Sequence, residues 1–172
     1  DIRMITGIPD AKISVVYLAP AKVFRSITDS AAISSVRRRH RLSKQFILYV
    51  GDVNWNKNVP GLLLAFAKLR SRNAGMKLVV VGNAFTQKNL RELQVLDALA
   101  DRLNIASHIV RTGFITDSEL AGLYSLASAY VQPSFAEGFG LPVLEAMACG
   151  CPVVASKASS LLEIAGPAIM VD

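Results

Sequence analysis

The chain has 172 residues, of which 52% are hydrophobic and 19% are charged. This length suits a single domain, and the hydrophobic fraction is ample for a packed core. No apolar run reaches the roughly 18 to 20 residues that a membrane helix needs, and no secretory signal opens the chain. We therefore expect a protein of the cytoplasm.

The net charge of +6 favours an anionic partner, but the excess is unevenly distributed. Much of it lies in a short basic run made of Arg37, Arg38, Arg39, Arg41 and Lys44. Such a run suits nucleic acid or the anionic inner face of a membrane. Because no aromatic residues alternate with the charges as stacking platforms, we expect a solvated surface segment and no nucleic-acid partner. A peripheral membrane contact stays open.

The first 44 residues are predicted to hold an edge strand and a variable surface segment. Residues 13–18 are mostly β-branched or aromatic and end before Pro20, which is typical of an edge strand leading into a domain. Residues 21–44 are less periodic, so we expect a short helix and a loop there.

Strands and helices alternate from residue 45 to residue 172. Short apolar runs, several of them closed by glycine, predict strands at residues 46–51, 78–82, 108–113, 129–132, 152–155 and 168–171. A continuous apolar run is typical of a parallel strand that is covered on both faces. The pattern predicts an α/β fold with a doubly wound, Rossmann-like parallel sheet of about six strands and helices on both faces.

The helices between these strands have recognisable starts and apolar stripes. Asn58 can cap the first and Thr86 can begin the second, while Thr116 and Glu119 have the spacing of a capping box for the third. A further short helix is expected at residues 159–165. The predicted core stripes are Leu62, Phe66 and Leu69; Leu93, Leu96, Ala100 and Leu103; and Leu120, Leu123, Tyr124 and Ala127.

Residues 137–145 read Glu-Gly-Phe-Gly-Leu-Pro-Val-Leu-Glu and predict a phosphate-binding turn before a helix. Pro142 suits a first helical turn, where its missing N–H would have no partner. The amides of Gly138, Phe139 and Gly140 would then lie at the positive end of the helix, which favours an anion.

The helix that Pro142 opens is expected to end at Gly150 and to be buried on most sides. Glu145 is its only charge, and a buried carboxylate needs a partner. From these residues alone two interpretations stay open. Glu145 and the glycines either serve only the helix dipole and the turn, or form part of a ligand site.

The two glutamates, the Gly-Phe-Gly-Leu-Pro segment between them and residues 146–154 closely resemble the signature of retaining glycosyltransferases of family 4, which have the GT-B architecture. The resemblance extends from about residue 13 to the C-terminus and is most specific between residues 135 and 163. It implies that Glu137 is the catalytic candidate, in contact with the donor sugar near the reacting carbon, and that Glu145 holds the ribose hydroxyls. It also implies that the main chain of Gly138, Phe139, Gly140 and Leu141 meets the donor diphosphate.

Other positions of the predicted site follow earlier strands. Ligands bind beyond the carboxyl ends of the strands in such a sheet, so the loop that Gly51 opens should line the crevice. Lys57 precedes the first core helix, where a cation is unfavourable unless an anion compensates it. The resemblance implies that Lys57 binds the diphosphate and that Phe114 and Ile115 hold the base.

One departure from the family pattern concerns charge. An Arg commonly precedes the lysine, whereas this chain has Asn56 beside Lys57 and Asp52 after the strand. One positive charge for the diphosphate is therefore missing.

Several other polar or reactive residues are expected to have structural roles. Cys149 and Cys151 are too close in sequence for comfortable disulfide geometry and are predicted to be small core residues. His40 and His108 have no carboxylate or nucleophile at motif spacing. Trp55 fits a lid, an interdomain contact or a simple surface position.

The resemblance implies the C-terminal, nucleotide-sugar-binding domain of a GT-B enzyme, residues 1–172, without the N-terminal acceptor domain. Mannose from GDP-mannose or glucose from a UDP donor would pass, with retention, to a glycan or lipid acceptor. The resemblance implies that no metal or other cofactor is needed, and the absence of an Asp-x-Asp pair agrees with this. Alternatives are a GT-B epimerase or hydrolase, or a non-catalytic nucleotide-binding domain. The chain begins at Asp1 without an initiator Met, so we expect a piece of a longer protein. Because a GT-B site is shared between two domains, we expect this piece to bind nucleotide but to transfer nothing.

Overall fold

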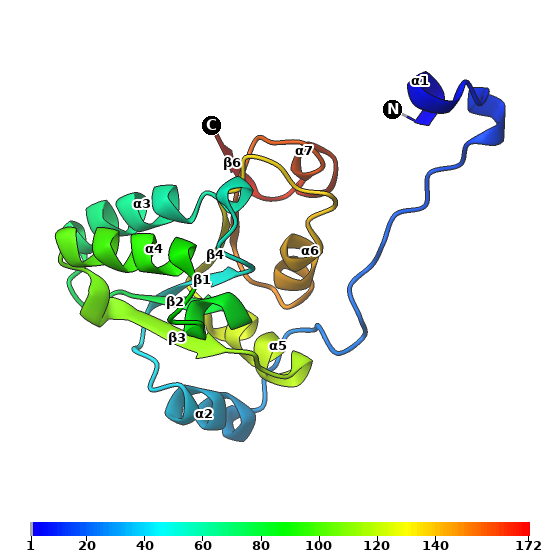
Figure 1. Ribbon diagram of the computed structural model, residues 1–172. Coiled ribbons are helices and arrows are strands. Elements are labelled where there is room, and N and C mark those ends of the chain that lie inside the picture. The colour runs from blue at the N-terminus through cyan, green and yellow to red at the C-terminus, as the bar shows by residue number, and fades with distance from the viewer. Residues whose placement is uncertain (1) are drawn as a thin grey trace.

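A computed structural model describes residues 2–172 and contains one parallel sheet, in the strand order β3-β2-β1-β4-β5-β6 (Figure 1). The strands are β1 (Phe46–Val50), β2 (Lys77–Val81), β3 (Ile109–Gly113), β4 (Ala129–Gln132), β5 (Val153–Ser156) and β6 (Ile169–Val171). The predicted doubly wound sheet is confirmed. Its direction of winding reverses between β1 and β4, where Leu48 is in register with Tyr130.

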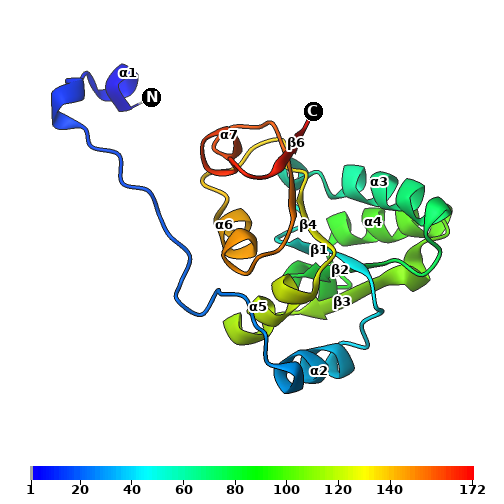
Figure 2. The same ribbon diagram turned by 180° about the vertical axis from the view of Figure 1, so that it is seen from behind.

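Helices lie on both faces of the sheet (Figures 1 and 2). One face carries α3 (Val59–Arg72) and α4 (Arg91–Arg102), and the other carries α2 (Ser30–Arg39), α5 (Asp117–Leu126) and α6 (Leu141–Ala148). The remaining helices are α1 (Ile2–Thr6) and α7 (Leu161–Ile164). Four 3-10 turns complete the described elements: Asp10–Lys12, Trp55–Lys57, Asn83–Thr86 and Ala106–His108.

Each face of the sheet has its own core, because side chains alternate along the strands. Phe46 and Leu48 of β1 pack in the cluster with α5 and α6, whereas Tyr49 packs in the cluster with α3 and α4. All three side chains are fully buried. This explains why the strands read as continuous apolar runs.

The α3 side of the sheet is only partly covered by helices of the described residues. Beside α3 an apolar groove of about 550 Å³ lies over the other end of the sheet, lined by residues that include Val131, Val154 and Val171.

Among residues 2–172, no helix is both long and apolar enough to cross a bilayer.

Local chemistry at the helix starts agrees with the sequence at two positions. Asn58 adopts the left-handed conformation at φ 50°, and its side chain accepts a hydrogen bond from the Gly61 amide at 3.2 Å. Thr116 and Glu119 form the predicted capping box at the start of α5. Hydrogen bonding to the Thr116 backbone holds the pKa of Glu119 below its usual value.

The predicted strand at residues 13–18 is wrong. The segment is extended but lies outside the sheet, and Val15, Val16 and Tyr17 are exposed (Figures 1 and 2). Residues 14–18 make no backbone hydrogen bond with another described residue. A β-branched run becomes a strand only when a neighbouring strand supplies those bonds.

Two smaller expectations also need correction. Thr86 does not begin the second core helix, because its hydroxyl donates to the Asn83 carbonyl and closes a 3-10 turn, and α4 begins at Arg91. Leu69 of the predicted stripe on α3 is 37% exposed, whereas Leu62 and Phe66 are buried. The stripes of α4 and α5 are confirmed at Leu93, Leu96, Ala100, Leu123 and Tyr124.

We expect Gly82→Ala to destabilise the domain by more than about 1 kcal/mol. Gly82 follows β2 and has a φ of 149°, and a Cβ there would lie 2.1 Å from the carbonyl oxygen of Gly51. The matched control is Gly166→Ala, since a Cβ at Gly166 meets nothing within 4 Å. Thermal unfolding followed by circular dichroism compares the two variants. Equal melting temperatures would contradict the proposed close approach of the two strand ends.

Candidate functional site

Two loops that meet at the carboxyl ends of β1 and β4 form the centre of the candidate site. The Phe135 amide donates to the Asn56 carbonyl at 2.8 Å, and the Asn56 side chain donates to the Ala136 carbonyl at 3.1 Å. The Asn58 side chain donates to the Pro133 carbonyl at 3.0 Å. The loops are therefore one hydrogen-bonded unit at the point where the winding reverses, which is where ligands bind in such sheets.

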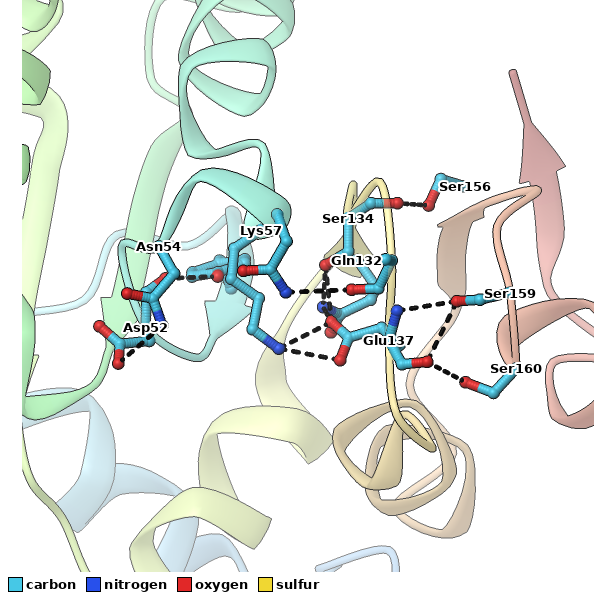
Figure 3. A network of polar contacts seen from close by, with 12 residues as sticks. Asp52, Asn54, Lys57, Gln132, Ser134, Glu137, Ser156, Ser159 and Ser160 are labelled. Atoms are coloured by element: carbon cyan, nitrogen blue, oxygen red, sulfur yellow. Dashed lines mark hydrogen bonds and ion pairs between the residues drawn. The ribbon is translucent and has the colours of Figure 1, made fainter. Parts of the chain in front are cut away.

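Lys57 and Glu137 form an ion pair across these loops (Figure 3). The Lys57 Nζ lies 2.9 Å from Oε1 and 2.8 Å from Oε2 of Glu137. The side chain of Glu137 is 8% exposed and that of Lys57 is 22% exposed. The anion expected to compensate Lys57 is therefore a residue of the chain itself, which the sequence did not indicate.

Buried polar side chains of β4 and its loop support the Glu137 carboxylate (Figure 3). Gln132 Nε2 and Ser134 Oγ donate to Oε1 at 2.7 and 2.6 Å. Gln132 also donates to Ser134, and the hydroxyl of Tyr130 donates to Gln132. Burial raises the pKa of Tyr130 well above its usual value, so the phenol stays a neutral donor. Such a chain of donors orients the carboxylate cooperatively.

The predicted helix after the glycine turn is confirmed as α6. Gly140 precedes it at φ 95°, and a Cβ there would lie 2.7 Å from Leu161 Cδ2, so only glycine fits. Gly150 ends it at φ 75°, with its amide bonded to the Met147 carbonyl. The Cys151 amide reaches the Ala146 carbonyl, which completes a Schellman motif.

The glycine turn leaves the main-chain amides of Gly138, Phe139 and Gly140 without partners among the described residues. They make no hydrogen bond with any other residue in the range 2–172. The Glu137 amide differs, since it donates to Ser159 Oγ at 2.8 Å. Three free amides at the start of a helix suit an anion.

Glu145 has the partner that its burial requires. It is 9% exposed, and the hydroxyl of Tyr124 on α5 donates to its Oε2 at 3.1 Å. Burial raises the pKa of Glu145 above its usual value, against the lowering effect of this hydrogen bond. The Oε1 atom of Glu145 makes no hydrogen bond with another residue in the range 2–172. From the sequence, Tyr124 belongs only to the core stripe.

The other predicted site residues lie farther out. Gly51 lines a separate cleft of about 440 Å³ beyond β1 and β2, together with Asp52. Asp52 bends back to accept from the Val53 amide at 2.7 Å. Phe114 is 79% exposed after β3, which β2 separates from β1, and Ile115 packs partly against the core.

Trp55 is a surface residue next to this site. It is 78% exposed, and its ring stacks on that of Phe135 at a centroid distance of 6.5 Å. Both cysteines are free and buried, as predicted. Burial raises the pKa of Cys149 to about 11 and that of Cys151 to about 12, which disfavours the reactive thiolate form.

The basic run lies at the C-terminal end of α2, where cations suit the helix dipole. Arg39 pairs with Glu119 of α5 at 2.7 Å, and Arg37 donates to the Ser43 carbonyl. His40 lies 3.9 Å from the same carboxylate, and burial lowers its pKa. These contacts give part of the run a structural role.

The sequence of the chain is similar to those of known proteins. Residues 33–169 match the family model described as Glycosyl transferases group 1. The chain belongs to this family. It is 38% identical over 137 residues to O-antigen chain mannosyltransferase B of Escherichia coli, covering 79% of this chain and 35% of that protein. It is 32% identical over 163 residues to the serotype-specific mannosyltransferase WbdA of Escherichia coli, covering 94% of this chain and 20% of that protein.

Solved structures share the fold of this chain, and one of them is named as a group 1 family protein. The C-terminal domain of the group 1 family protein LpcC from Francisella tularensis superposes with a TM-score of 0.75 at 26% identity, covering 90% of this chain and 80% of that one. The glycosyltransferase WaaG gives a TM-score of 0.78 at 18% identity, covering 95% and 43%. HepE of Anabaena, in complex with UDP and glucose, superposes with a TM-score of 0.74 at 23% identity, covering 87% of this chain and 40% of that one. The domain spans about a third or less of the two mannosyltransferases named above.

Replacing Lys57 with Ala should lower the free energy of unfolding by about 2 kcal/mol, because it leaves the Glu137 carboxylate buried without its cation. The matched control is Lys157→Ala, which breaks a pair with Asp172 whose side chains are 48% and 90% exposed. That change should cost less than about 1 kcal/mol. Urea unfolding at low and high salt measures both. Equal losses would show that the Lys57 pair is no stronger than a surface pair.

Glu145→Gln should make the unliganded domain more stable at pH 7 than the wild type. The pKa of Glu145 is raised by burial, so the unfolded chain ionises at lower pH, and the wild type loses stability as the pH rises between the unfolded and folded values. The advantage of the variant should therefore vanish at a pH below the unfolded pKa. Melting temperatures across the acid range test this. A variant less stable than the wild type at pH 7 would refute it.

Proposed function

We propose that this domain binds the nucleotide-sugar donor of a retaining glycosyltransferase of family 4. The observation that carries the proposal is the juxtaposition of the Lys57–Glu137 pair with the unbonded amides of residues 138–140. Several free N–H groups beside an ion-paired lysine, at the start of a helix, suit a dianionic group.

The diphosphate would occupy the start of α6. A nucleoside diphosphate is the leaving group of sugar transfer, and it develops charge as the glycosidic bond breaks. Preformed donors stabilise such charge without reorganisation. Lys57 and the amides of Gly138, Phe139, Gly140 and Leu141 supply these donors in the proposal, so neither a metal nor another cofactor is needed. Phe114 and Ile115 are assigned to the base by resemblance alone.

The two glutamates take different tasks. The carboxylate of Glu137 is oriented by three donors and is assigned to the donor sugar beside the reacting carbon. Glu145 has one oxygen on Tyr124 and the other unbonded, which suits acceptance of a hydrogen bond from a ribose hydroxyl. The resemblance suggests both roles, and the geometry is compatible with them.

The identity of donor and acceptor is proposed from relatives. Two of the relatives are named mannosyltransferases, one of them for the O-antigen chain, which favours GDP-mannose and a glycan or lipid-linked acceptor. HepE binds UDP and glucose, which keeps a UDP-linked hexose as the second donor to test. We assign the acceptor site to a separate N-terminal domain and the reaction to the cytoplasm, at the inner face of the membrane.

A panel of nucleotides tests the binding proposal. The domain should be stabilised against heat by either GDP and GDP-mannose or UDP and UDP-glucose, because a ligand that binds only the native state raises its stability. Lys57→Ala should lower the affinity for the nucleoside diphosphates about tenfold and leave the affinity for guanosine or uridine unchanged, because only the diphosphates carry the anion. No stabilisation by any member of the panel would refute the proposal.

The activity is tested with radiolabelled sugar nucleotides and an extract of possible acceptors. The 172-residue chain should transfer nothing, because a site shared by two domains loses the positioning that speeds the reaction. A longer protein that includes an N-terminal domain should form product. Free sugar or an epimer in place of a transfer product would favour the hydrolase or epimerase alternative. Binding without turnover by the longer protein would favour a non-catalytic domain.

A further inference from the structure

Two serines between β5 and α7 hold both main-chain polar groups of Glu137 (Figure 3). The Glu137 amide donates to Ser159 Oγ at 2.8 Å. The hydroxyls of Ser159 and Ser160 lie 3.1 Å from the Glu137 carbonyl oxygen and donate to it. The contacts join the loops after β4 and β5, and the bonded residues are 22 and 23 positions apart.

Ser159 adopts an unfavourable backbone conformation to make these bonds. Its φ is 41°, in the left-handed region that residues other than Gly, Asn and Asp rarely adopt. Ser159 is also exposed, so burial of its side chain does not explain the conformation. Strain of this kind persists where the surrounding structure imposes it, and it is concentrated at functional sites.

The same segment holds the other end of the glycine turn. Leu161 and Ile164 of α7 pack so closely on Gly140 that a Cβ there would lie 2.7 Å from Leu161 Cδ2 and 3.0 Å from Ile164 Cδ1. The turn of residues 137–140 is thus fixed at its first residue by hydroxyls and at its last by apolar side chains. The free amides lie between these two points.

We propose that Ser159 and Ser160 are positioning residues that aim the amides of residues 138–140 and the Glu137 side chain at the donor. The inference rests on the function proposed above. The Glu137 amide is already used by Ser159, so an anion at this turn is bound by the three amides that follow. A small displacement of such a preformed site costs much of its binding and rate.

Ser159→Gly is the most informative variant, because glycine accepts the left-handed conformation but has no hydroxyl. It should therefore keep or raise the melting temperature while binding GDP or UDP, whichever the wild type binds, about tenfold more weakly. Guanosine or uridine should bind as before. The double variant Ser159→Gly, Ser160→Ala should bind the nucleoside diphosphate still more weakly. The control is Ser71→Ala, whose hydroxyl donates only to the Lys68 carbonyl on the surface of α3.

Amide NMR of the 172-residue chain gives both readouts, since it reports ligand titrations and the hydrogen exchange of the Glu137 amide. Exchange should quicken in Ser159→Gly. Unchanged diphosphate affinity in the double variant would overturn the inference, as would equal weakening of nucleoside and diphosphate, which indicates a merely structural role. If the wild type binds no nucleotide, the proposed function is wrong, and so is the positioning role of the two serines. Hydrogen exchange of the Glu137 amide would then still test its hydrogen bond to Ser159.

Discussion

The ion pair between Lys57 and Glu137 is the interaction on which the arrangement of the site depends. It joins the loops after β1 and β4, the strands at which the sheet reverses its winding. Separating a carboxylate that is 8% exposed from its cation is costly. Because Gln132 and Ser134 also donate to this carboxylate, and Asn56 joins the same loops, the geometry exists before any ligand binds. Preorganisation of this kind is what a site for developing charge requires.

Two features around this pair reduce the stability of the unliganded domain. Glu145 is buried beside a neutral phenol rather than a cation, and Ser159 is held in a left-handed conformation. Several helix ends follow ordinary rules, as the capping box of α5 and the Schellman motif of α6 show. Departures from local rules that gather around one ion pair suit a site shaped for a ligand.

Local chemistry made most of the fold predictable. The six strands appear within a residue or two of their predicted bounds, because continuous apolar runs and glycines are local signals. The strand predicted at residues 13–18 is absent because a strand also needs a neighbouring strand, which no local pattern reveals. The Glu137–Ser159 bonds, the Lys57–Glu137 pair and the Tyr124–Glu145 bond join residues 22, 80 and 21 positions apart, so spacing could not indicate them. The glutamates and Lys57 were singled out because the family pattern marks them, whereas Tyr124, Ser134 and Ser159 carry no motif.

The charge balance of the site explains why the serines matter. Lys57 and Glu137 neutralise each other, and Asn56, where the family commonly has Arg, is used to join the two loops. A bound diphosphate would therefore meet little net positive charge from side chains. The remaining attraction comes from the start of α6, where the helix dipole contributes about 0.3 to 1 kcal/mol at exposed sites and up to about 2 kcal/mol when partly buried. Hydrogen bonds from three amides depend on direction as well as distance. A site that relies on amides in place of a second cation must hold its turn still, and the contacts of Ser159, Ser160 and α7 do so.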